Sequence, residues 1–365
     1  MSSPQRKIRV AVVFGGRSSE HAISCVSASS VMAALDPARY EIVPIGITRA
    51  GSWVLTDGDP ERLQIHGTTL PQVESGSAVV LPGDPTAGGL VVVEPGEGAR
   101  TLGDVDVVFP LLHGAYGEDG TIQGLLEMAG APYVGAGVLG SAVAMDKEYT
   151  KKLLRAEGLP VGDFVVLRSG ERISPASRDR LGLPVFVKPA RAGSSIGITR
   201  VTDWAAMDEA VDKARAIDPK VLVEAAVVGR EIECGVLEGL AGGPPEASLP
   251  AEIRLLGGHD FYDFEAKYLE DASEFDIPAK LSDDASAALR AMAGRAFTAL
   301  DGAGLARVDF FVGAGEEITI NEVNTMPGFT AISMFGKAWA ATGLAYPDLL
   351  DRLVDTALRR GTGLR

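Results

Sequence analysis

Apolar and polar positions follow a strand–helix rhythm over the first part of the chain. Residues 8–14 (IRVAVVF) predict a buried strand that ends at two glycines, and small and apolar residues from about 20 to 35 follow at helical spacing. Apolar runs at 40–48 and 105–110 predict two more strands. This order favours an α/β fold with a doubly wound parallel sheet. Short valine runs among glycine, proline and threonine at about 57–103 predict hairpins and loops.

The remaining chain predicts helices set among short strands. Helical spacing at about 121–130 and 141–157 ends each time at a glycine that is followed by a proline. From residue 164 onward, short apolar runs separated by turns predict antiparallel strands. Further helices are predicted at about 204–216 and 283–302, strands at 306–312 and 316–324, and an amphipathic helix from Tyr346. This order fits three packed subdomains around a cleft.

Composition and charge narrow the classes of function. The 365 residues are 46% hydrophobic and 23% charged, an ordinary globular mix that allows two or three domains. A net charge of −15 argues against nucleic acid and anionic lipid as partners. The N-terminal residues lack the apolar core of a signal peptide, and no apolar run approaches the roughly 18 residues of a membrane span. With only Cys25 and Cys234 present, we expect a cytoplasmic protein with reduced thiols and without a zinc site.

Three glycine-rich turns are candidates for anion binding. FGGRSSEH joins a strand to a helix whose N-terminal N–H groups suit an anion, and it carries Glu20, which is otherwise an ordinary helix-terminal glutamate. In VFVKPARAGSSIGI, Lys188 precedes a Gly/Ser turn, which suits a triphosphate; the alternative is a hairpin with a solvent-exposed lysine. GAGVLG (135–140) matches the dinucleotide fingerprint but follows only a weak strand, so it is a weak signal.

The densest polar chemistry lies on two predicted strands, ARVDFF and ITINEVN. Glu322 and Asn324 are two residues apart and therefore face the same way. If Asp309 lies on the neighbouring strand, three oxygen donors converge, and such donors select Mg²⁺ bridging nucleotide phosphates. Arg307 would then point into the same cleft. The alternative is a coincidental grouping at the surface.

Seven segments in this order resemble the D-alanine–D-alanine ligase family of the ATP-grasp superfold. They are VFGGRSSEH, FPLLHGAYGEDGTIQGLLE, AMDK, VFVKPARAGSSIGI, EAKY, RVDFF and NEVNTMPGFT, and they span almost the whole chain. The resemblance implies a three-subdomain ATP-grasp architecture whose mixed and antiparallel sheets enclose the nucleotide. It places an N-terminal substrate-binding domain at 1–138, a central subdomain at 139–227, and a C-terminal subdomain with metal ligands and a lid at 228–365. The candidate lid is the loop at about 257–280.

For the nucleotide, the resemblance implies ATP with two Mg²⁺ ions, for which Mn²⁺ can substitute. Phosphate contacts would come from Lys147 and Lys188, and adenine and ribose contacts from Glu224 and Glu231. Ser195 and Asn321 would also contact the nucleotide, and Asp309, Glu322 and Asn324 would hold the metal ions. Ala225 stands where the family often has a lysine, which is a departure at the adenine contact.

For the substrates, the resemblance implies two D-alanine molecules joined through a D-alanyl phosphate, for peptidoglycan synthesis. Glu20 would bind the first ammonium group, while Ser194 and Tyr268 would bond with Glu20 and pin a closing loop. Arg307 and the Gly328 amide would stabilise the oxyanion, and Ser333 and Met334 would receive the second carboxylate. Lys267 would approach the transferred phosphate, and His113 would lie near the second substrate. Tyr268 favours an amine nucleophile over D-lactate, and the family implies a homodimer.

Three alternatives remain open at this point. Another ATP-grasp carboxylate–amine ligase would share the nucleotide residues but would not need Glu20, Ser194 and Tyr268 together. A dinucleotide-dependent oxidoreductase built on GAGVLG would leave the Asp309 and Glu322 carboxylates without a purpose. A catalytically inactive nucleotide-binding module would be expected to lack Arg307 or a metal ligand, and all of these are present.

Overall fold

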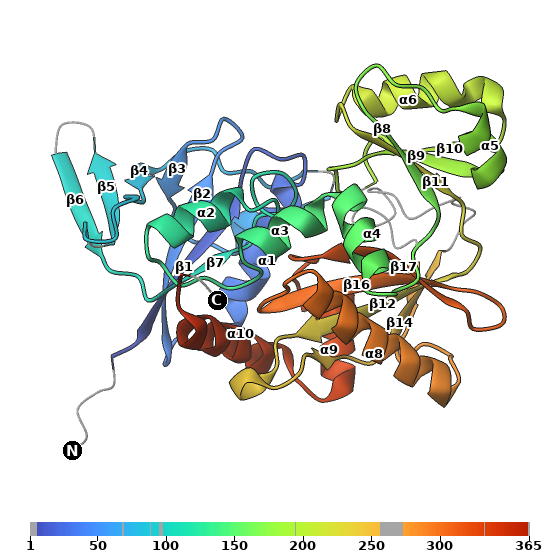
Figure 1. Ribbon diagram of the computed structural model, residues 1–365. Helices are drawn as coiled ribbons and strands as arrows, with labels where there is room; N and C mark the ends of the chain where they lie inside the picture. Colours follow the sequence, from blue (N-terminus) through green and yellow to red (C-terminus); the bar gives the residue numbers. More distant parts are fainter. Residues whose placement is uncertain are drawn as a thin grey trace.

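The computed structural model describes residues 6–363 except 68, 88, 95–97, 194, 256–272 and 332. Three β-sheets form the framework, and helices pack against them (Figure 1). Within the described part of the chain, no helix has both the length and the apolar character needed to cross a bilayer.

The N-terminal sheet has the strand order β6-β5-β4-β3-β2-β1-β7. Strand β1 (Ile8–Gly15) pairs in parallel with β2 (Tyr40–Ile47) and β7 (Val107–Pro110), and helix α1 (His21–Ala34) connects β1 to β2. The predicted strand–helix–strand unit is therefore confirmed.

The hairpins expected between β2 and β7 continue this sheet instead of forming a separate excursion. They comprise β3 (Trp53–Leu55), β4 (Ser77–Val80), β5 (Leu90–Glu94) and β6 (Gly98–Gly103), with the short 3-10 helix η1 (Glu61–Leu63) between β3 and β4. All four strands pair antiparallel, so the N-terminal sheet is mixed and its parallel part is limited to three strands. Pairing with β3 covers the backbone edge that β2 would otherwise expose.

Three short helices lead from the N-terminal sheet to the central one. They are α2 (Thr121–Met128), α3 (Val138–Met145) and α4 (Lys147–Ala156). The prediction of one continuous helix over 141–157 was wrong, because Asp146 adopts an extended conformation and its carboxylate accepts a hydrogen bond from the Glu148 amide at 3.1 Å. This cap starts a new helix at Lys147.

The GAGVLG segment packs closely against another part of the chain. Its last glycine, Gly140, lies so close to the turn at Asp301 that an added Cβ would stand 2.7 Å from the Asp301 carbonyl oxygen. The segment before it contributes an isolated bridge from Tyr133 to Val108. Gly140 therefore serves close packing.

The central sheet has the order β10-β9-β11-β8, and its helices pack against it (Figure 1). Its strands are β8 (Phe164–Leu167), β9 (Val185–Pro189), β10 (Thr199–Val201) and β11 (Val221–Ala225), and its helices are α5 (Pro175–Leu181), η2 (Trp204–Ala206) and α6 (Met207–Arg215). The strand pairs are antiparallel, as predicted. Val187, Val211 and Val223 belong to a hydrophobic core that this sheet forms with its own helices.

The C-terminal sheet has the order β15-β14-β12-β16-β17, and β13 pairs with β12. Its strands are β12 (Arg230–Leu237), β13 (Glu246–Ala247), β14 (Ala251–Leu255), β15 (Ser273–Asp276), β16 (Leu305–Val312) and β17 (Ile318–Asn324). The 3-10 helix η3 (Leu240–Gly242) and helices α8 (Asp283–Ala299), α9 (Met334–Thr342) and α10 (Tyr346–Arg360) complete this part.

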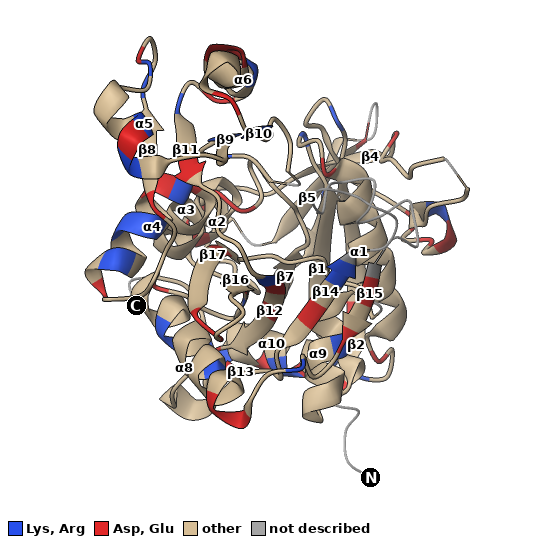
Figure 2. Ribbon diagram, turned by 90° about the vertical axis from the view of Figure 1, so that its right-hand side faces the viewer, with Lys and Arg blue, Asp and Glu red and all other residues tan. Residues whose placement is uncertain are grey.

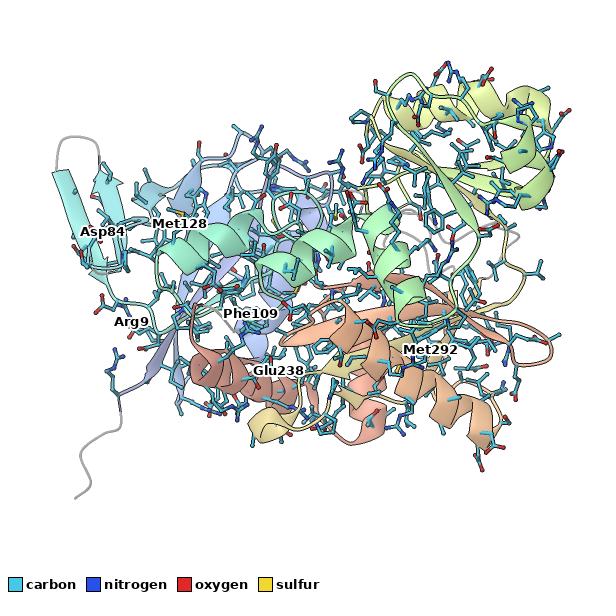
Figure 3. All side chains as sticks on the ribbon, in the orientation of Figure 1. Arg9, Asp84, Phe109, Met128, Glu238 and Met292 are labelled. Atoms are coloured by element: carbon cyan, nitrogen blue, oxygen red, sulfur yellow. The ribbon has the colours of Figure 1, made fainter. Side chains whose placement is uncertain are left out.

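The N-terminal and C-terminal sheets share one hydrophobic core, which α10 closes. Phe109 of β7 lies in this core (Figure 3), with its ring 5.7 Å from the ring of Phe329. The Tyr40 hydroxyl donates to Asp351 of α10 at 2.7 Å, which ties α10 to β2. Burial of these aromatic groups stabilises the contact between the two sheets. The central sheet, with its separate core, contributes a further wall to the space between them.

Candidate functional site

A cleft of about 1010 Å³ lies where the three sheets meet. Its lining includes fifteen of the residues that the sequence singles out: Glu20, His113, Lys147, Lys188, Ser195, Glu224, Glu231, Arg307, Asp309, Asn321, Glu322, Asn324, Gly328, Ser333 and Met334. Ser194, Lys267, Tyr268 and residues 257–272 of the candidate lid lie outside the described residues. Side chains that are distant in sequence thus surround one space.

One wall of the cleft is the acidic cluster, formed by Asp309, Glu322 and Asn324 with Arg307. Strands β16 and β17 are antiparallel neighbours in which Asp309 faces Glu322 and Arg307 faces Asn324. The condition set by the sequence, that Asp309 lies on the strand next to Glu322, is therefore confirmed. The Asn324 amide donates to Asp309 at 2.9 Å. Figure 2 shows both signs of charge around these strands.

Arg307 balances the carboxylates of this wall. It donates two hydrogen bonds of 2.6 Å to the two oxygens of Asp309, and its Nε lies 3.2 Å from a carboxylate oxygen of Glu233 on β12. Burial opposes the charged form, but Asp309 and Glu233 hold the pKa of Arg307 well above its ordinary value. Glu233 was missed by the sequence analysis. The period of two in REIECGVL places it on the same face as Glu231, and that signal would have identified it.

The chemistry of the donors fits Mg²⁺. Within the described ranges, no group of three or more His, Cys, Asp and Glu side chains is arranged to hold a metal ion. The acidic cluster supplies two carboxylates and one amide oxygen instead. Mg²⁺ prefers hard oxygen ligands, keeps several waters, and is commonly shared between one or two carboxylates and nucleotide phosphates. The residues present therefore fit Mg²⁺ beside a phosphate chain.

A second wall carries the lysine cluster, in which Lys151 and Lys188 flank Glu224 and Lys147 lies nearer to Glu322. The Lys188 Nζ lies 2.5 Å from one carboxylate oxygen of Glu224, and Lys151 forms an ion pair with the other. Burial opposes ionisation of Glu224, but Lys188 and Lys151 lower its pKa to about 2. The Lys147 Nζ donates to the Ala192 carbonyl at 2.8 Å and lies 3.7 Å from Glu322, which joins the two clusters.

Lys151 is the second residue that the sequence analysis missed. It lies four positions after Lys147 on α4, so both lysines occupy one face of the helix. A polar residue at this spacing after AMDK was a readable signal. Its burial beside a carboxylate was not readable, because Glu224 comes from a strand more than 70 residues later.

Glu20 lies at the end of the cleft formed by the N-terminal domain, and two glycines make room for it. An added Cβ at Gly114 would stand 2.6 Å from a carboxylate oxygen of Glu20, and one at Gly193 would stand 2.7 Å from the same atom. Gly114 follows β7 and Gly193 lies in the loop after β9. The Glu20 carboxylate is therefore enclosed between the N-terminal and central parts of the chain.

His113 and Glu118 fix the segment that follows β17. The Met326 carbonyl can only accept, so His113 Nδ1 carries the proton of their 3.0 Å hydrogen bond, and Ser27 donates to His113 Nε2 at 3.0 Å. Burial lowers the pKa of His113, which favours this neutral form. Glu118 accepts from the Met326 amide at 3.1 Å and from the Gly114 amide at 2.7 Å. Both backbone groups of Met326 are thus held two residues before Gly328.

Ser333 precedes the N-terminus of α9 at the cleft. Its hydroxyl donates to the Thr330 carbonyl at 2.7 Å and accepts from the Thr330 amide at 3.2 Å. The hydroxyl therefore stabilises the turn before the helix, while the first amides of α9 begin at Met334, which lines the cleft. A helix N-terminus of this kind favours an anionic group.

Comparisons with known proteins agree over the whole chain. A family model described as D-ala D-ala ligase N-terminus matches residues 9–136, and one described as D-ala D-ala ligase C-terminus matches residues 153–355. A D-alanine–D-alanine ligase of Rhodococcus opacus (strain B4) is 62% identical over 372 residues, covering 100% of both chains.

Solved structures show the same fold. A D-Ala:D-Ser ligase, VanG, from Enterococcus faecalis matches with a TM-score of 0.82 at 34% identity, covering 96% of this chain and 100% of that one. A D-alanine–D-alanine ligase from Bacillus anthracis complexed with ATP matches with a TM-score of 0.72 at 28% identity, covering 97% and 98%. The expected α/β ATP-grasp fold is confirmed, and the chain belongs to the D-alanine–D-alanine ligase family.

Proposed function

We propose that this ligase joins two D-alanine molecules to D-alanyl-D-alanine through a D-alanyl phosphate and releases ADP and phosphate. The dipeptide would serve the synthesis of peptidoglycan precursors. The observation that carries the proposal is the meeting of three groups in one cleft. Glu20 offers a carboxylate for an ammonium group, the lysine cluster offers cations for phosphates, and the acidic cluster offers oxygen ligands with Arg307 beside them.

In the nucleotide subsite, Lys147 and Lys188 bind the phosphates of ATP. Glu224 and Glu231 face the adenine and ribose, with Ser195 and Asn321 as further contacts. Two Mg²⁺ ions, or Mn²⁺, would be held by Asp309, Glu322 and Asn324, and would offset the charge that develops on the phosphates. Lys267, outside the described residues, is proposed to approach the transferred phosphate.

In the first half-reaction, Glu20 orients the first D-alanine by its ammonium group. The substrate carboxylate oxygen attacks the γ-phosphorus, the bond to the bridging oxygen breaks, and ADP leaves. The enclosure of Glu20 by Gly114 and Gly193 supports a small substrate there. Ser194 and Tyr268 are proposed to bond with Glu20 and to pin the lid at 257–280, which would exclude water from the acyl phosphate.

In the second half-reaction, the α9 N-terminus at Ser333 and Met334 binds the carboxylate of the second D-alanine. Its amine attacks the acyl carbon, and Arg307 with the Gly328 amide stabilises the oxyanion before phosphate leaves. Burial lowers the pKa of His113, and its Nδ1 is bonded to the Met326 carbonyl, which supports a role in holding this segment near the second substrate. The subdomain boundaries at 138/139 and 227/228, the homodimer and the cytoplasmic location remain proposals that accompany this function.

The test is phosphate release from ATP and Mg²⁺ with D-alanine, L-alanine, D-serine and D-lactate in parallel, with the products identified by mass. D-alanyl-D-alanine formed from D-alanine, at a rate above the other acids, supports the proposal. Turnover that yields only a product with D-serine or D-lactate, or ATP hydrolysis that is independent of D-alanine, contradicts it.

A further inference from the structure

Lys151 is a buried ammonium group that joins three elements. Its side chain is 1% exposed. From α4 it forms an ion pair with Glu224 on β11, and it donates to the Asn321 carbonyl on β17 at 3.1 Å. It therefore links the central sheet to the strand that carries Glu322, at the point where the lysine and acidic clusters meet.

Glu224 is shared between two lysines that differ in their access to the cleft. Lys188, 2.5 Å from Glu224, lines the cleft, whereas Lys151 lies behind it. Two ammonium groups against one carboxylate leave one positive charge in excess at this wall. A buried charge needs compensation, and an anionic ligand that enters the cleft reaches Lys188 first.

Glu224 itself has little room to move. An added Cβ at Gly162 would stand 2.8 Å from one carboxylate oxygen of Glu224. The linker that carries Gly162 is tied to β17, because the Ile320 amide donates to the Pro160 carbonyl at 2.9 Å and Val161 forms a bridge with Ile320. The backbone next to the Glu224 carboxylate is therefore held against β17.

We propose that Lys151 is a positioning residue that keeps Glu224 neutralised and in place while Lys188 turns from Glu224 to the nucleotide phosphates. The inference rests on the proposed nucleotide site. Without Lys151, Lys188 is the remaining cation bonded to Glu224 in this ion-pair set, so releasing it would leave a buried carboxylate uncompensated. Lys188 is then retained by Glu224, and the nucleotide loses a phosphate contact.

The first test is nucleotide affinity in the full-length Lys151→Met variant. Lys152→Met is the matched control, because Lys152 is the next residue of α4, has a side chain that is 57% exposed, and pairs with Glu148 at 2.7 Å outside the cleft. Affinity for a non-hydrolysable ATP analogue with Mg²⁺ is measured by calorimetry, and KM is measured for ATP and for D-alanine.

Lys151→Met is expected to weaken analogue binding and raise KM for ATP by about tenfold or more, with KM for D-alanine unchanged and Lys152→Met like the wild type. A purely structural role would lower the thermal stability but leave the affinity of the folded protein unchanged. Analogue affinity equal to that of the wild type overturns the inference.

A second measurement does not require the Lys151 variant to fold. Lysine Nζ resonances of the ¹⁵N-lysine-labelled wild type are recorded with and without the analogue and Mg²⁺, and the Lys188 resonance is assigned by its absence from Lys188→Met. Lys220 is also buried, so its resonance is assigned in the same way from Lys220→Met. We expect the Lys188 resonance to move while the remaining buried ammonium resonance, that of Lys151, keeps its position. A Lys188 resonance that stays in place, or movement of both, contradicts the exchange of partners.

Failure of the inference is distinguishable from failure of the proposed function. Ligation of D-alanine with normal analogue binding by Lys151→Met rejects the role of Lys151 and leaves the function standing. Analogue binding that depends on Lys151 in a chain that does not ligate D-alanine rejects the function and supports the role. A wild type that binds no nucleotide contradicts both.

Discussion

The acidic cluster and the lysine cluster carry charge in the same cleft but are assembled differently. Arg307, Asp309, Glu322 and Asn324 come from two adjacent strands, and their contacts follow from the register of one antiparallel pair. The lysine cluster draws on α4, β9 and β11, so its contacts depend on how separate elements pack. A local arrangement is readable from the sequence, whereas one built from distant elements is not.

The two clusters also differ in which charge is in excess. In the acidic cluster Arg307 contacts two carboxylates, Asp309 and Glu233, and Glu322 adds a third negative charge nearby. In the lysine cluster two ammonium groups share Glu224. The negative excess of the acidic cluster suits divalent cations, and the positive excess of the lysine cluster suits phosphates. The two clusters lie side by side, because Lys147 Nζ is 3.7 Å from the Glu322 carboxylate.

The largest expected effect comes from the acidic cluster. Arg307→Lys keeps a positive charge but loses the planar fork that donates two hydrogen bonds to Asp309. We expect kcat for D-alanine ligation to fall by about 10² or more, as for the loss of an oxyanion donor. Steady-state kinetics measure the effect, and Arg62→Lys is the control because the Arg62 side chain is 73% exposed. A kcat within a factor of two of the wild type would contradict the role of Arg307.

The next effect concerns the enclosure of Glu20. In Gly193→Ala the new Cβ would stand 2.7 Å from the Glu20 carboxylate and displace it. We expect kcat/KM for D-alanine to fall by about tenfold to a hundredfold, because displacement of a binding group by about 1 Å has effects of this size. Gly124→Ala is the control, since no heavy atom lies within 4 Å of its added Cβ. Equal kcat/KM values for Gly193→Ala and Gly124→Ala would show that activity does not depend on the position of the Glu20 carboxylate beside Gly193.

A smaller effect is expected at the junction of the two clusters. Lys147→Met removes the hydrogen bond to the Ala192 carbonyl and the cation near Glu322. We expect KM for ATP to rise by about tenfold, because one phosphate contact of several is lost. KM for D-alanine should remain unchanged. Kinetics with ATP varied at saturating D-alanine measure the first value, and a rise in KM for D-alanine alone would contradict the assignment.

The smallest expected effect is a change in thermal stability with pH. Burial and the charge of Glu20 raise the pKa of Glu118 to about 8, above its ordinary value of 4.5. Its folded pKa is raised, so its contribution to stability is fully present below about pH 4.5 and is lost as the pH rises through about 8. Between pH 5 and 8 we expect the wild type to lose a few degrees in Tm relative to Glu118→Gln. Parallel melting curves for both proteins would contradict this.

Much of the fold follows from local patterns. The strand–helix–strand unit at the N-terminus and the two separate strands β16 and β17 were predictable because apolar periodicity and turn residues determine them. The pairing of β16 with β17 was a condition of the sequence analysis, and the structure meets it. The break at Asp146 was not, because residues 141–157 keep a helical pattern while the Asp146 carboxylate caps a new helix. The extension of the N-terminal sheet by β3–β6 was not either, since pairing partners depend on tertiary contacts.

In the site, too, local patterns were predictable and contacts between distant segments were not. The common direction of Glu322 and Asn324 was predictable from strand alternation, whereas the place of Asp309 beside them depended on a strand pairing that the structure supplies. The roles of single residues came from resemblance to the family. Lys151 was missed because its partner, Glu224, lies far away in the sequence, and the hydrogen bond of Glu118 to the distant Met326 amide was unpredictable for the same reason. A buried charged residue becomes visible only when the group that compensates it is known.

The measurement that tests the central claim most directly follows oxygen from substrate to product. The wild type is given ATP, Mg²⁺ and D-alanine labelled with ¹⁸O in its carboxylate, and the released phosphate is analysed by mass. Attack of the D-alanine carboxylate on the γ-phosphorus transfers one labelled oxygen, so we expect one ¹⁸O in each phosphate and D-alanyl-D-alanine in equal amount. Phosphate without the label would contradict a D-alanyl phosphate formed in this cleft.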